Sequence, residues 1–94
     1  MLKERNIEDY LHRRVKELGG EYRRLKWQGR NDAPDDLILL PGRHILIECK
    51  KPGEVPSGAQ LREHERLRSS GFEVHVAESF EDIDSILPKR KVQP

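Results

Sequence analysis

Two short acidic stretches and one lysine are the residues of this chain whose types and spacing could do chemistry. Residues 33–36 are APDD, and residues 48–50 are ECK. Two carboxylates held close together repel each other unless a cation neutralises them. A magnesium or manganese ion does so through oxygen ligands, and it lowers the pKa of a bound water. Because a nearby ammonium stabilises charge that develops on a phosphate, the set suits phosphodiester hydrolysis.

A β-hairpin is the element that must bring the two stretches together. Its expected strands are residues 36–40 and 44–50, on either side of a turn at Pro41-Gly42-Arg43. The acidic residues lie at the strand ends far from this turn, so pairing of the strands also pairs the acids.

Two registers are open for this hairpin. If the turn has two residues, Asp35 faces Glu48; if Arg43 belongs to the turn, Asp36 faces Glu48 instead. Either register puts a carboxylate at about 4.5–5.5 Å from Glu48, measured between Cβ atoms. Lys50, two residues further along its strand, points to the same face as Glu48.

Hydrophobic spacing and capping residues predict the remaining elements. Asn6 is expected to cap a first helix that ends before Gly19-Gly20, and Ser57 with Gln60 forms a capping box for a second. The expected order is a helix to residue 18, strands at 21–27, 36–40 and 44–50, a helix at 57–70, a strand at 72–76 and a short helix at 79–87. The first three strands form an antiparallel meander, and the crossover helix makes the last two strands parallel. The fold class is therefore α/β, with a mixed central sheet flanked by helices.

Length and composition bound the class of protein. Ninety-four residues allow one domain, expected over residues 1–88 and followed by a loose basic tail at residues 89–94. Charged residues make up 37%, yet Leu, Ile and Val gather in periodic segments, which favours a folded domain over disorder. The lone Cys49 excludes an internal disulfide and a thiolate zinc cluster, and fits a reducing compartment. No apolar run reaches the roughly 18 residues that span a bilayer, so we expect a cytoplasmic protein.

Basic residues gather in the first half of the chain. Residues 10–30 contain seven lysines and arginines against two glutamates, whereas residues 52–94 carry more acids than bases. This asymmetry predicts a face that lies on a polyanion, and the alternative is a solvated helix face with an exposed strand. The candidate phosphate contacts are Arg13, Arg14, Arg23, Arg24, Lys26, Arg30 and Lys51.

The motifs resemble those of a known nuclease family. APDD followed by IECK is similar to the PD-(D/E)XK nuclease motif, and the wider segment 17–79 resembles the virus-type replication-repair nuclease (VRR-NUC) domain in its small stand-alone phage and bacterial form. The similarity extends from about Ile7 to Leu87. It implies an α-β-β-β-α-β fold and a metal-dependent DNA endonuclease in a bacterial or phage-infected cell. It further implies a homodimer that acts on branched DNA such as four-way junctions.

The resemblance also implies a role for each matched residue. Asp35 and Glu48 correspond to the two metal-binding acids, the backbone carbonyl of Cys49 to a third ligand, and Lys50 to the catalytic lysine. Glu8 would complete the shell of an Mg²⁺ or Mn²⁺ ion.

Other positions leave alternatives open. Gln60 matches a family glutamine near the active site, but its place in the capping box also explains it. Glu8 could instead be a favourable first-turn charge on the helix dipole. Asp32 and Asp36 depart from the family pattern, where glycine and arginine are usual.

Two other functions are possible on the same fold. One is a catalytically silent nucleic-acid-binding module, and the other is a protein-interaction domain whose acidic half docks a partner. The intact set of Asp35, Glu48 and Lys50 favours the nuclease over both.

Overall fold

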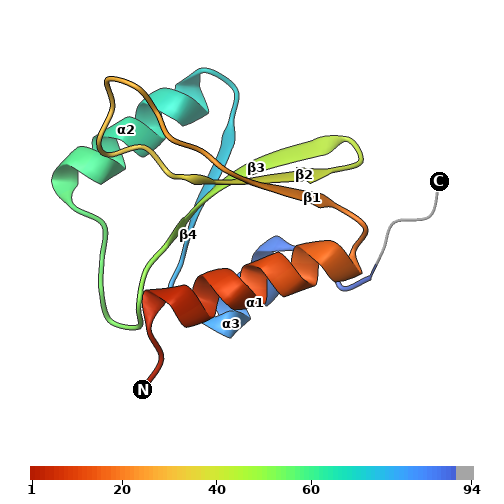
Figure 1. Cartoon of the computed structure of the whole chain (residues 1–94). Helices are drawn as coiled ribbons and strands as arrows, with labels where there is room; N and C mark the ends of the chain where they lie inside the picture. The colour runs from red at the N-terminus through yellow and green to blue at the C-terminus, as the bar shows by residue number, and fades with distance from the viewer. Residues whose placement is uncertain (91–94) are drawn as a thin grey trace.

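The elements follow the expected order. A computed structural model describes residues 1–90, and the part of the expected tail at residues 91–94 lies outside them. The elements are α1 (Glu4–Glu17), β1 (Glu21–Arg24), β2 (Asp36–Leu40), β3 (Arg43–Cys49), α2 (Gly58–Ser69), β4 (Glu73–Ala77) and α3 (Phe80–Ile86) (Figure 1). The strands form one mixed sheet in the order β1-β2-β3-β4, antiparallel from β1 to β3 and parallel between β3 and β4. The predicted α/β class and topology are confirmed.

The sheet separates two layers of helices. Helices α1 and α3 lie on one face, and α2 lies on the other (Figure 1). Strand β3 contributes side chains to both layers because successive side chains of a strand point to opposite faces of the sheet. Ile45, Ile47 and Cys49 join the main core beneath α1 and α3, while the buried Leu46 belongs to the α2 face. Glu48 follows Leu46 on that second face, so the carboxylate predicted to do chemistry lies in the thinner layer.

The turn between β2 and β3 decides the register. Leu40 pairs with Arg43, which leaves Pro41 and Gly42 as a two-residue turn, with φ of 72° at Gly42. Glycine adopts this left-handed conformation without the steric cost of a side chain. The ladder runs on to Asp36 opposite Ile47, so the next residues along, Asp35 and Glu48, face each other at the end of the hairpin. The first of the two open registers is therefore correct.

Several boundaries differ from the predictions. Strand β3 covers residues 43–49 rather than 44–50, and β4 ends at Ala77 rather than at residue 76. Helix α1 begins at Glu4 rather than after Asn6, because the Asn6 side-chain oxygen accepts the Lys3 backbone N–H at 2.7 Å from inside the first turn. Strand β1 ends at Arg24 rather than Trp27, whose ring N–H donates to the Pro34 carbonyl at 2.8 Å and holds the loop instead. Strand β4 starts one residue late, and Phe72 before it is exposed.

The capping box of the second helix is as predicted. Gln60 N–H donates to the Ser57 hydroxyl oxygen at 3.1 Å, and Ser57 N–H donates to the Gln60 side-chain oxygen at 2.9 Å. Within residues 1–90, no helix has the length and apolar character needed to cross a membrane.

Candidate metal centre and nucleic-acid interface

Three carboxylates meet where the start of α1 passes the start of β2. Glu8 comes from α1, and Asp35 and Asp36 come from the chain entering β2; each offers one oxygen, and these oxygens lie within 4.8 Å of one another. We call these three residues the acidic cluster. Oxygen ligands of this kind suit a hard divalent cation.

Asp36 is the buried member of the acidic cluster. Its side chain is enclosed, and its Oδ1 atom accepts a hydrogen bond of 2.5 Å from the Tyr22 hydroxyl. Its Oδ2 atom is buried without a hydrogen-bond partner among residues 1–90. A buried carboxylate oxygen that lacks a partner is costly, and a bound cation would satisfy it. The acidic cluster therefore fits a divalent metal ion on its donor chemistry.

The carboxylates of the acidic cluster have shifted pKa values. Burial raises the pKa of Glu8 to about 7; the Asp36 charge adds to this rise, and Arg24 opposes it. Burial likewise raises the pKa of Asp36, although the Tyr22 hydrogen bond acts in the other direction. Carboxylates that resist ionisation together gain most from a neutralising cation.

Arg24 on β1 already neutralises part of the acidic cluster. Its Nη1 lies 2.6 Å from Glu8 Oε2, and its Nη2 lies 3.2 Å from Asp35 Oδ2. The Arg24 side chain is 55% exposed, so the guanidinium keeps donors open to solvent. An arginine predicted to contact phosphates thus sits directly on two of the three acids.

Glu48 lies on the α2 face of β3 and is not one of the three acids whose oxygens lie within 4.8 Å of one another, and Lys50 follows the end of β3. Burial raises the pKa of Glu48 to about 7, while the Lys50 charge opposes the rise and the Asp35 charge adds to it. Lys50 is only 12% exposed, and its Nζ lies 3.7 Å from Glu54 Oε1. The charges of Asp35 and Lys50 thus both act on Glu48, while the roles predicted for these three residues stay predictions.

Cys49 and Gln60 have clear structural explanations. Burial, followed by the Asp36 charge, raises the pKa of the Cys49 thiol, which points into the main core and is unsuited to act as a nucleophile. The side-chain oxygen of Gln60 is engaged in the capping box with Ser57. This hydrogen bond agrees with the alternative in which Gln60 caps α2.

The geometry has counterparts among solved structures. One chain described as a VRR_NUC domain is 39% identical to this chain and superposes with a TM-score of 0.81, covering 92% of this chain and 95% of its own. This chain belongs to the VRR-NUC domain family. A chain described as a VRR_NUC domain protein, 21% identical, superposes with a TM-score of 0.65 over 90% of this chain and 84% of its own, and supports the fold alone.

A curated relative of this VRR-NUC domain comes from a phage. “Putative nuclease p44” of Acyrthosiphon pisum secondary endosymbiont phage 1 is 44% identical over 89 residues, which span 94% of this chain and 95% of the relative. No family model matches the chain.

Three residues of the VRR-NUC site were not assigned from the sequence. The sequence presents Asp36 as a possible partner of Glu48 and as a departure from the family pattern, but not as a metal ligand; in the structure it shares the buried face of β2 with Ile38 and Leu40. An acid at a core position of a strand is the signal that could have marked it. Tyr22 and His64, which approach Asp36 and Glu48, lie far from them in sequence and carry no such signal.

The predicted phosphate contacts do not form one continuous face of the VRR-NUC domain. Arg14 lies between α1 and α3, with Nε 3.0 Å from Asp84 Oδ1 and a second bond of 3.2 Å to the Pro88 carbonyl. Arg30 lies on the other side of the sheet, 3.6 Å from Glu63 of α2. Arg13 and Arg23 form exposed pairs with glutamates of their own elements, and Lys26 and Lys51 are exposed.

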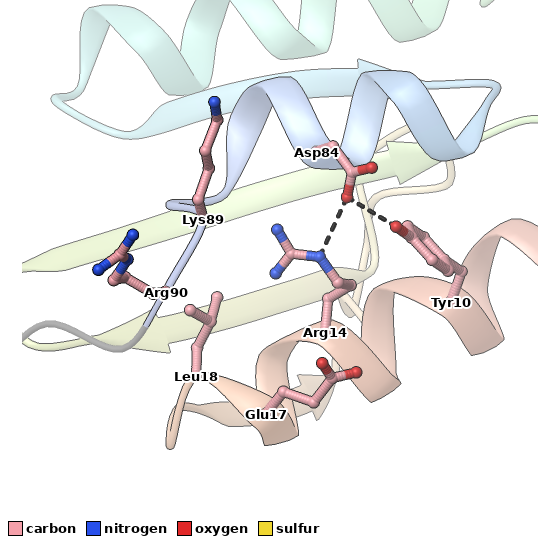
Figure 2. A pocket seen from close by; sticks show the side chains of 7 residues that line it. All are labelled: Tyr10, Arg14, Glu17, Leu18, Asp84, Lys89 and Arg90. Atoms are coloured by element: carbon pink, nitrogen blue, oxygen red, sulfur yellow. Dashed lines mark hydrogen bonds and ion pairs between the residues drawn. The ribbon is translucent and has the colours of Figure 1, made fainter.

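A surface pocket of about 460 Å³ lies beside Arg14. It is lined by Tyr10, Arg14, Glu17, Leu18, Asp84, Lys89 and Arg90 (Figure 2). Figure 2 shows Arg14 and the Tyr10 hydroxyl both pointing to Asp84, with Lys89 and Arg90 at the rim. This pocket belongs to the α1–α3 contact, and the acidic cluster is not part of its lining among residues 1–90.

Proposed function

We propose that this VRR-NUC domain is a metal-dependent endonuclease that hydrolyses phosphodiester bonds in DNA, with Mg²⁺ or Mn²⁺ as its cofactor. One observation carries the proposal: the end of the hairpin brings Asp35 and Asp36 together with Glu8 of α1, and the charges of Asp35 and Lys50 both act on Glu48 of the neighbouring strand. Both the family and the name of the phage relative agree with a nuclease.

Each residue of the site has a separate role in the proposed reaction. Glu8, Asp35 and Asp36 would hold the ion, with Glu48 and the Cys49 carbonyl contributing from the neighbouring strand. A bound divalent ion supplies an activated water and neutralises phosphate charge. Lys50 is mostly buried and its charge acts on Glu48, and its ammonium would stabilise the negative charge that develops on the phosphate during attack. Arg24 is anchored by two of the acids and can direct its remaining donors toward a DNA phosphate.

Cleavage should depend on the ion and on Lys50. A panel of linear, nicked, flap and four-way-junction DNAs is incubated with the protein in Mg²⁺, Mn²⁺ or EDTA. We expect cutting only with a divalent ion, because closely placed carboxylates repel a phosphate unless a cation lies between them. Strong cleavage in EDTA would exclude the mechanism.

Lys50 and Lys51 provide a matched pair of variants. Lys50→Ala should lower the cleavage rate about 10²–10³-fold while DNA binding persists, since affinity comes mainly from other phosphate contacts. Lys51→Ala removes the same charge one residue away, from an exposed side chain; as a candidate phosphate contact Lys51 should affect DNA affinity, but the cleavage rate of bound DNA, measured with enzyme in excess, should stay near that of the wild type. Glu48→Ala should behave like Lys50→Ala. Equal activity in the Lys50 and Lys51 variants, or DNA binding without cutting by the wild type, would favour the silent module.

A further inference from the structure

His64 and Glu48 face each other with buried polar atoms that form no hydrogen bond within residues 1–90. His64, on α2, is 0% exposed, and its Nε2 lies 3.5 Å from Glu48 Oε1. Both ring nitrogens of His64 and the Oε1 atom of Glu48 are buried without a hydrogen bond among residues 1–90. The approach joins the crossover helix to the strand that carries the ECK motif.

The approach of His64 to Glu48 needs an explanation because its polar atoms are buried. A polar group removed from water costs free energy unless it forms a hydrogen bond, so unpartnered buried groups are rare and need an explanation. Here a donor and an acceptor lie about half an ångström beyond a typical hydrogen bond. A small movement of either side chain would satisfy Nε2 and Oε1 at once.

We propose that His64 is a positioning residue for Glu48. The Nε2–H of His64 donates to Glu48 Oε1, which fixes the carboxyl group and leaves its Oε2 atom free to turn toward the acidic cluster and the ion. Outer partners of this kind orient metal-binding groups, and their loss typically weakens metal affinity about 10- to 100-fold. The inference rests on the proposed function for its consequence, but the hydrogen bond itself does not.

The hydrogen bond can be tested without metal, DNA or activity. Long-range ¹H–¹⁵N NMR on the full chain with ¹⁵N-labelled histidine reports which ring nitrogen of each of the four histidines carries the proton. His64, assigned with His64→Gln, should carry it on Nε2, and Glu48→Ala should speed exchange of that proton with water. A proton on Nδ1 alone, or a signal that is unchanged by Glu48→Ala, overturns the proposal.

The consequence can be tested by metal affinity. Free Mn²⁺ measured by electron paramagnetic resonance gives the affinity of each variant. His64→Leu fills the space without a donor and should weaken Mn²⁺ binding about 10-fold. His64→Gln keeps an N–H donor of similar reach and should recover most of the loss. Equal losses in both variants would mean that His64 acts only by packing, which overturns the positioning role.

A packing control separates stability from positioning. Val74 lies on the same α2 face, paired with the buried Leu46 in the register of β3 and β4. Val74→Ala should lower the melting temperature yet leave Mn²⁺ affinity within about twofold of wild type. A 10-fold loss of Mn²⁺ affinity in Val74→Ala would mean that the effect of His64→Leu comes from destabilised packing rather than from the lost hydrogen bond. A wild-type protein that binds no Mn²⁺ would refute the proposed function, and the NMR result would still decide the hydrogen bond.

Discussion

Arg24 shows how a single side chain can tune the acidic cluster. Burial and the Asp36 charge raise the pKa of Glu8, the Arg24 charge opposes them, and the pKa that results is about 7. Because a metal ion binds the ionised carboxylate, a proton on Glu8 competes with it. In Arg24→Gln the pKa of Glu8 should rise further, so the pH midpoint for Mn²⁺ binding should move to higher pH.

The neighbouring Arg23 makes the control for this prediction. Arg23 is 57% exposed, close to the value for Arg24, but its partner is Glu21 rather than the acidic cluster. Mn²⁺ affinity measured between pH 6 and 9 should shift its midpoint in Arg24→Gln and keep it in Arg23→Gln. Equal shifts of the pH midpoint in the two variants would mean that the pKa of Glu8 depends on the net charge nearby rather than on the direct ion pairs of Arg24 with Glu8 and Asp35.

The positions of candidate site residues were predictable where the motif is local in sequence, and their roles stay predictions. Asp35, Glu48 and Lys50 follow from two short motifs and one hairpin, and the structure brings them together. The approach of His64 to Glu48 was not predictable. It depends on how the crossover helix rotates against the sheet, which no local spacing specifies.

The elements themselves were predicted well because their signals are strong and short in range. The Pro41-Gly42 turn allowed two registers, and the pairing of Leu40 with Arg43 selects one. Strand ends were predicted less well, because tertiary hydrogen bonds decide them. Trp27 leaves the expected strand to donate to the Pro34 carbonyl, a contact invisible in a hydrophobic pattern.

An ion pair between the first residues of β3 and β4 should make the stability of the fold depend on pH. Arg43 donates to both carboxylate oxygens of Glu73, at 2.9 and 2.5 Å, and His75 approaches the same group at 2.6 Å. The hydrogen bonds from Arg43, followed by that of His75, lower the pKa of Glu73 to about 2. A folded-state pKa below the unfolded value near 4.3 stabilises the fold above that pH, and the stabilisation is lost as pH falls toward 2.

Glu73→Gln should therefore destabilise the domain at neutral and mildly acidic pH, and progressively less as the pH falls from about 4.3 toward 2. Since the pair is about one-third exposed, screening limits its contribution to about 0.5–1 kcal/mol, or about 3–6 °C in melting temperature at pH 7. Circular dichroism melts at pH 7, 4.5 and 2.5 should show this difference shrinking toward zero. Glu65→Gln, which removes a more exposed partner of Arg68 within α2, serves as control. A difference that persists unchanged at pH 2.5 would show that Glu73 acts through packing rather than charge.

At the scale of the whole molecule, the predicted phosphate contacts wrap around the domain. Arg14 lies on the α1–α3 side and Arg30 on the α2 side, while Arg24 lies at the acidic cluster between them. A duplex that lies flat on one face would miss part of this set. Neutralising Arg13 and Arg30 together should weaken binding and reduce its salt dependence on a branched DNA more than on a linear duplex. Equal effects on the two DNAs would place the contacts on one face.

This distribution leads to the prediction that the working unit is a homodimer acting on four-way junctions. The domain has a radius of gyration of 13.0 Å and one acidic cluster among residues 1–90, so a single copy offers one cut and a small footprint. Resolving a junction requires two symmetry-related cuts, which a twofold dimer provides through one self-complementary interface. Sedimentation at micromolar concentration should give twice the monomer mass for the free protein, and two protein copies for each junction in the complex. Monomers that stay single on DNA and cut flaps faster than junctions would contradict both the dimer and the substrate.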